Sequence, residues 1–101
     1  MLLLGALSAC ATASSTVPGK TAASPALQRD ILQYILAIDS DKDCKERKLV
    51  STELVTPPTS ANSFISIERW MLDRCGKPAA YQVIMNPSPR GGTDFKVGPA
   101  R

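Results

Sequence analysis

The sequence predicts an α+β domain in which one N-terminal amphipathic helix packs on a three- or four-stranded antiparallel sheet, pinned by one disulfide. Three observations predict this fold. Apolar residues recur every three or four positions after a Ser-Pro pair, and the later segments are short, rich in β-branched and aromatic residues, and bounded by Pro, Gly or Asn. Two cysteines, Cys44 and Cys75, lie in the part of the chain that we expect to fold.

The helix is expected to start at Ser24 and Pro25, because a hydroxyl side chain caps a helix and proline is tolerated at its first position. The spacing after this start predicts one apolar face and one polar face. We expect the apolar face to carry Leu27, Ile31, Tyr34, Ile35 and Ile38, and the polar face Gln28, Arg29, Asp30 and Gln33.

Four segments have the composition of strands, namely residues 48–55, 63–72, 79–85 and 94–97. In the second segment the alternation of apolar residues changes phase, because Ile65 and Ile67 have odd numbers and Trp70 and Leu72 have even ones. Either a bulge near Glu68 and Arg69 or a strand buried on both faces would explain the change.

The first ten residues, "MLLLGALSAC", predict a targeting segment and not part of the folded domain. Residues 1–7 are apolar or glycine, a run too short to span a bilayer but of the length found in signal-peptide cores. Residues 7–10, "LSAC", resemble the lipobox of bacterial lipoproteins. No charged residue precedes Lys20, whereas signal peptides usually begin with Lys or Arg, which allows a start codon further upstream.

This resemblance implies that residues 1–9 are a lipoprotein signal peptide and that Cys10 carries the lipid anchor. Three acyl chains, palmitate among them, would hold the protein permanently on a membrane. Ala11 stands where an Asp would favour retention in the inner membrane, so we expect the outer membrane, facing the periplasm. Residues 10–24, mostly small and polar, are expected to form the lipidated cysteine and a flexible tether, and residues 25–101 a single small domain.

With Cys10 assigned to the lipid, Cys44 and Cys75 remain as an even pair in an exported protein, which predicts a disulfide. The alternative is two buried free thiols. A catalytic thiol is less favoured, because the sequence has no CxxC spacing and no histidine to activate one.

No segment predicts a metal site or a catalytic site. Asp39, Asp41 and Asp43 match the first positions of a calcium-binding EF-hand loop, but Cys44 and Val50 stand where that loop needs Gly and Glu. The acids in or beside strands, Glu53, Glu68 and Asp73, have no spacing that pairs two of them for acid-base chemistry. We therefore expect no enzyme activity, no metal and no other cofactor.

A second resemblance covers residues 70–95. "WMLDRCGKPAAYQV" and "GGTDF" are similar to a pattern found in small exported bacterial proteins and lipoproteins of uncharacterised function. The resemblance implies a hairpin whose Cys-Gly turn is disulfide-bonded, with Trp70 and Tyr81 packed near the bridge, and it implies no activity. Trp70 and Tyr81 fit a core; the alternative is an exposed binding patch, made of Trp70, Tyr81, Arg90, Gly91 and Gly92.

Together these features predict a lipid-anchored protein of the cell envelope with a binding or structural role, an accessory of an envelope complex. Its expected partners are the membrane, through the anchor, and envelope proteins. The net charge of +3 is small and unclustered, so nucleic acid is not an expected partner. The alternatives are an inhibitor or shield against a cell-wall hydrolase, whose loop 86–93 would enter the enzyme, and, least favoured, a small hydrolase.

Overall fold

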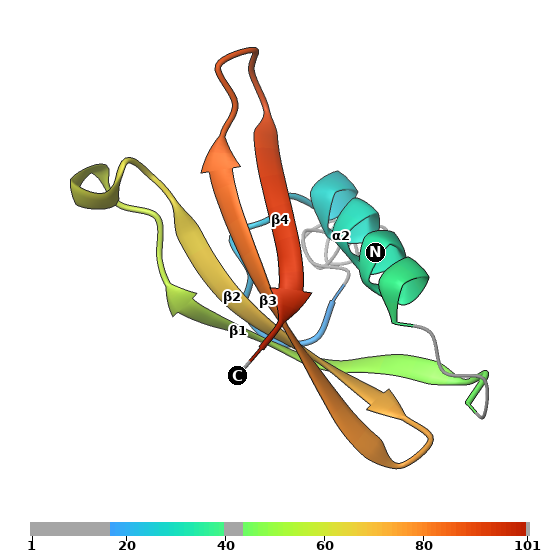
Figure 1. The fold of residues 1–101 in the computed structure, drawn as a ribbon. Coiled ribbons are helices and arrows are strands. Elements are labelled where there is room, and N and C mark those ends of the chain that lie inside the picture. The colour runs from blue at the N-terminus through green and yellow to red at the C-terminus, as the bar shows by residue number, and fades with distance from the viewer. Residues whose placement is uncertain (1–16, 40–43, 101) are drawn as a thin grey trace, which may run out of the picture.

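A computed structural model describes residues 17–39 and 44–100. One helix, α2 (Pro25–Ile38), is followed by the strands β1 (Arg47–Thr56), β2 (Ser66–Arg74), β3 (Lys77–Pro87) and β4 (Thr93–Pro99), with a short 3₁₀ helix, η1 (Ser60–Asn62), between β1 and β2. The strands form one antiparallel sheet in the order β1-β2-β3-β4 (Figure 1). The predicted α+β class is confirmed, with four strands and one disulfide.

The helix lies on one face of the sheet, and the core fills the space between them (Figure 1). Ile31 and Ile35 of α2 are fully buried. They belong to the same cluster as four residues that point from the sheet toward the helix, namely Trp70, Leu72, Val83 and Met85. Because side chains alternate across a strand, the residues between these four point to the other face of the sheet, which no described element covers.

The start of α2 is as predicted, since Leu27 N donates to Ser24 Oγ at 3.3 Å. The predicted faces are partly wrong. Gln28 was expected to point outward but is buried, and its side-chain amide donates to the Ala23 carbonyl at 2.8 Å. Tyr34 and Ile38 were expected to be covered but are 47% and 42% exposed. The buried face of the helix is thus narrower than the apolar face that its sequence pattern predicted.

Neither explanation offered for the change of phase applies, because the register shifts beside β2 fall in β1 and the second face of β2 is only half-buried. β2 pairs with β3 without a break, and the residues that point into the core are Ser66, Glu68, Trp70 and Leu72. Ile67 lies half-buried on the other face, and Ile65 precedes the strand. The apolar alternation changes phase because a carboxylate, Glu68, occupies a core position. It accepts hydrogen bonds from Trp70 Nε1 at 2.8 Å and from Ala22 N at 2.6 Å.

The chain before α2 is packed where the sequence predicted part of a flexible tether. Thr52 N of β1 donates to Pro18 O at 2.9 Å, and Lys20 N donates to Thr52 O at 3.2 Å. Val17 and Ala23 are buried in the core. The folded part of the chain therefore includes residues 17–24 and does not begin at residue 25.

Gly19 permits this close approach. A Cβ atom at Gly19 would lie 2.2 Å from Thr52 O, and the φ angle of +97° favours glycine. Gly19→Ala should lower the free energy of unfolding by about 1–3 kcal/mol, measured by urea denaturation. The control is Gly98→Ala, because nothing lies within 4 Å of a Cβ there, and it should have little effect. Equal stability of the two variants would contradict this packing of the segment.

Candidate functional site

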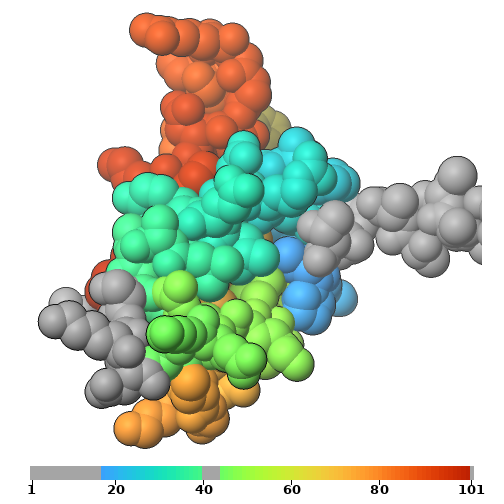
Figure 2. Space-filling model, turned by 90° about the vertical axis from the view of Figure 1, so that its right-hand side faces the viewer, coloured from blue at the N-terminus to red at the C-terminus, as the bar shows by residue number. Residues whose placement is uncertain are grey.

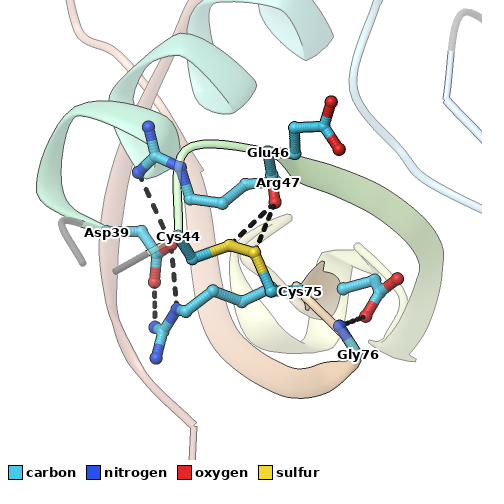
Figure 3. Close-up of a disulfide and its surroundings, with 8 residues drawn as sticks. Asp39, Cys44, Glu46, Arg47, Cys75 and Gly76 are labelled. Atoms are coloured by element: carbon cyan, nitrogen blue, oxygen red, sulfur yellow. Dashed lines mark hydrogen bonds and ion pairs between the residues drawn. A yellow bond between two sulfur atoms is a disulfide. The ribbon is translucent and has the colours of Figure 1, made fainter. Parts of the chain in front are cut away.

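The predicted disulfide is present between Cys44 and Cys75, whose Cα atoms lie 5.9 Å apart. Cys75 and Gly76 form a two-residue turn between β2 and β3, and their φ angles of 51° and 87° are those of a type I′ hairpin. Gly76 N donates to Asp73 Oδ1 at 2.9 Å (Figure 3). The bridge thus ties this turn to the segment that leads into β1. We call this region of the molecule the disulfide end.

Asp39, directly after α2, has a buried carboxylate that lies beside the bridge (Figure 3). It accepts hydrogen bonds from Arg74 Nη2, from Arg74 Nε at 3.3 Å, and from the Tyr81 hydroxyl. Arg47 Nη1 lies 3.5 Å from Asp39 Oδ2 and donates to the Leu36 carbonyl at 2.9 Å. A carboxylate at a helix C-terminus opposes the helix dipole, and the two arginines compensate for it.

The hydrogen bond from Arg74 holds the pKa of Asp39 below its ordinary value, against the effect of burial. Burial, together with the bond to Asp39, raises the pKa of Tyr81. Both shifts favour one protonation state, an ionised carboxylate and a neutral phenol. Because the carboxylate oxygens are occupied by protein donors, this cluster joins the helix to the sheet and is not arranged to bind or transform a ligand.

The sulfur atoms of the bridge lie against a backbone carbonyl. Glu46 O is 3.0 Å from Cys44 Sγ and 3.7 Å from Cys75 Sγ (Figure 3). A disulfide sulfur carries no hydrogen, so these are close sulfur-oxygen contacts and not hydrogen bonds. Cys44 is buried, whereas Cys75 is exposed.

The structure does not bring the predicted binding patch together. Trp70 is fully buried and Tyr81 is half-buried with its hydroxyl on Asp39. Arg90, Gly91 and Gly92 are exposed in the turn between β3 and β4, at the opposite end of the sheet (Figure 1). Of the five residues of that patch, only the three in this turn are exposed.

The uncovered face of the sheet is a surface that the sequence analysis did not single out. Ile67 of β2 lies opposite Ile84 of β3, and Arg69 lies opposite Gln82, all of them half-buried. Two open hollows of about 270 and 170 Å³ adjoin this face. Gly98 of β4 lines the larger hollow, and Val55 lines the smaller one. The sequence did contain a signal for this face, namely the odd-numbered apolar residues of β2.

A further hollow of about 270 Å³ opens at the end of the sheet opposite the disulfide. It lies between the N-terminal turn of α2, the loop from β1 to β2, and the ends of β3 and β4. None of the side chains that line it is charged: Ala22, Ser24, Leu27, Pro58, Phe64, Ser66, Met85, Pro87 and Thr93. We call this region, with loop residues 57–65 and turn residues 88–92, the loop end.

The acids considered from the sequence are dispersed. Glu68 is in the core, whereas Glu53 and Asp73 lie opposite Arg69 and Lys48 on the uncovered face. Within residues 17–39 and 44–100, no three His, Cys, Asp or Glu side chains group closely enough to hold a metal ion. No helix in the same ranges is both long and apolar enough to cross a membrane.

Comparisons with protein-family models, with curated proteins and with solved structures find no match for this chain. The two resemblances noted in the sequence therefore stay predictions. Cys10, the predicted lipidation site, lies outside the described residues, and so do Asp41 and Asp43.

Asp39→Asn should destabilise the protein by about 2–4 kcal/mol at neutral pH, because it leaves two partly buried arginines without their anion. The native pKa is lowered, so the contribution of Asp39 is complete above its ordinary value of 3.8 and is lost as the pH falls through the native pKa. Denaturant titrations as a function of pH measure both effects.

The matched control is Asp30→Asn, which removes an exposed carboxylate from the same helix. It should leave the stability and its acid dependence almost unchanged. If the two variants lose stability equally, or if Asp39→Asn keeps the acid dependence of the wild type below pH 3.8, the cluster does not have the role assigned to it.

Proposed function

We propose that this protein is exported, anchored by lipid at Cys10 in the cell envelope, and acts there as a non-catalytic binding or structural accessory of an envelope complex. The observation that carries the binding role is the uncovered face of the sheet. The anchor and the location rest on the lipobox resemblance, which makes the outer membrane, facing the periplasm, the proposed site.

The disulfide supports export. Structural disulfides form and persist in oxidising compartments, such as the bacterial periplasm, and are rare in the cytosol. The bridge also suits a chain of this size, since small exported domains rely on crosslinks to supplement a limited core.

The uncovered face has the composition of a surface that binds protein. Apolar Ile67, Met71 and Ile84 occupy its centre, and Arg69 and Gln82 lie among them. Charges of both signs, on Glu53 and Lys96, occupy flanking strands. Its hollows are open and small, whereas small-molecule sites are usually enclosed and larger, about 300–1,000 Å³. A protein partner with a broad surface therefore fits this face better than a small ligand.

A second candidate is an inhibitor of a cell-wall hydrolase. The observation that favours it is the turn between β3 and β4, which projects beyond the rest of the domain (Figure 2). Arg90 and the two glycines at its tip are exposed, and the glycines have no side chain. A turn of this shape fits an enzyme cleft.

Photo-crosslinking in intact envelopes distinguishes these candidates. A Cβ atom at Gly98 would have no neighbour within 4 Å, so a benzoylphenylalanine introduced there should preserve the fold and capture a partner protein. The same group at Arg90 tests the turn, and at Ala37, on the exposed side of α2, it serves as the control. Capture of one defined partner at Gly98 alone is the expected result. Capture of a hydrolase at Arg90 alone would favour the inhibitor, and equal labelling at all three sites would contradict the proposal.

A further inference from the structure

From the placement of its apolar and charged residues, we propose that the loop end rests on the lipid surface, with Phe64 and Ile65 entering the boundary between headgroups and acyl chains. This inference rests on the proposed lipid anchor and adds the orientation in which the anchored domain is held.

The loop between β1 and β2 exposes two adjacent large apolar side chains. Phe64 is 56% exposed and Ile65 is 37% exposed. Phe64 also lines the uncharged hollow of the loop end. A single exposed apolar residue is ordinary, but an adjacent pair beside an uncharged hollow marks a contact surface.

The loop holds this pair outward through its own hydrogen bonds. Phe64 N donates to Thr59 O at 2.7 Å, and Ile65 N donates to Asn62 O at 3.1 Å. The Asn62 side chain accepts from Thr59 N at 2.9 Å and donates to Pro57 O at 3.2 Å. Phe64 adopts a φ of 61°, a region that a bulky residue rarely occupies. The exposed position is therefore built into the loop, and contact with another surface would require little further ordering.

The distribution of charge favours lipid over protein as the occupant. No charged residue occurs between Glu53 and Glu68, a stretch of 14 residues that includes the whole loop. A charge at membrane depth is costly, whereas a protein partner would impose no such exclusion. The only charge in the neighbouring turn, residues 88–92, is Arg90, which suits the phosphate of a lipid headgroup.

The opposite end of the molecule has the contrary character. The disulfide end carries Asp39, Arg47, Asp73, Arg74 and Lys77. Figure 1 places the loop from β1 to β2 and the turn from β3 to β4 away from the hairpin turn at Cys75 and Gly76. Resting on the loop end would keep the charged end in water.

The short chain before the fold keeps the domain near the membrane. Val17, the first described residue, comes seven positions after Cys10, and seven steps of extended chain span at most about 25 Å. Within that reach the contact is intramolecular, so two inserted side chains are enough to orient the domain.

Fluorescence quenching by brominated lipids tests this orientation. Trp70 is the only tryptophan and is fully buried, so the lipidated wild type in such vesicles should show almost no quenching. Phe64→Trp places a second indole in the loop and should be strongly quenched. The matched control, Tyr34→Trp, places one at a 47% exposed position of α2 and should not be quenched. Vesicles of phosphatidylethanolamine with a minor share of phosphatidylglycerol serve as the probe.

Vesicle flotation separates the two proposals. If the protein floats and the indole of Phe64→Trp is not quenched, the anchor stands and the lipid contact of the loop is wrong. Equal quenching of both variants would contradict the orientation. If the wild type does not float, the proposed lipid anchor is wrong. The lipid contact of the loop is then tested separately in the Cys10→Ser variant. In that background Phe64→Ser should lower vesicle partitioning about tenfold, and an unchanged value would overturn the inference.

Discussion

A buried carboxylate directly after α2, the one α-helix in the described residues, sets the geometry of this small domain. Asp39 receives Arg74 from β2 and Tyr81 from β3, and Arg47 from β1 lies within ion-pair distance. Side chains from three strands thus contact the carboxylate that follows the helix. The Cys44–Cys75 disulfide lies beside this carboxylate. Because one end of α2 is fixed in this way and the other contacts the segment before it, the helix covers one face of the sheet and leaves the other free.

The two ends of the sheet differ in chemistry as a consequence. Ion pairs and the crosslink concentrate at the disulfide end, where they hold the elements together. The loop end is free of this requirement and carries apolar residues, an uncharged hollow and one arginine in its turn. In the proposed arrangement the loop end contacts lipid, the charged end faces water, and the uncovered face between them is presented to a partner. The three surfaces can therefore act at the same time.

The sequence predicted the features that depend on local pattern. The prediction failed where the position of a residue depends on a contact with a residue elsewhere in the chain. The Ser24 cap, the helical period and the four strands are local, and the pairing of Cys44 with Cys75 follows from counting. Gln28 was misplaced and the core position of Glu68 was not predicted, because each is buried with a partner that no periodicity shows, a carbonyl for Gln28 and an indole for Glu68. The packing of residues 17–24 depends on a glycine that meets Thr52, far along the chain. Trp70 lies in the core as its residue type indicated, and the alternative of an exposed patch does not form, since Trp70 and Arg90 come from different depths and different ends of the sheet.

The most direct test of the account is the intact mass of the protein extracted from envelopes, measured with and without reduction before thiol alkylation. We predict a mature chain that begins at Cys10 and carries three acyl chains, with Cys44 and Cys75 alkylated only after reduction. A chain that carries no lipid and whose two cysteines are alkylated without reduction would contradict both the anchor and the crosslinked, exported state on which the proposed function depends.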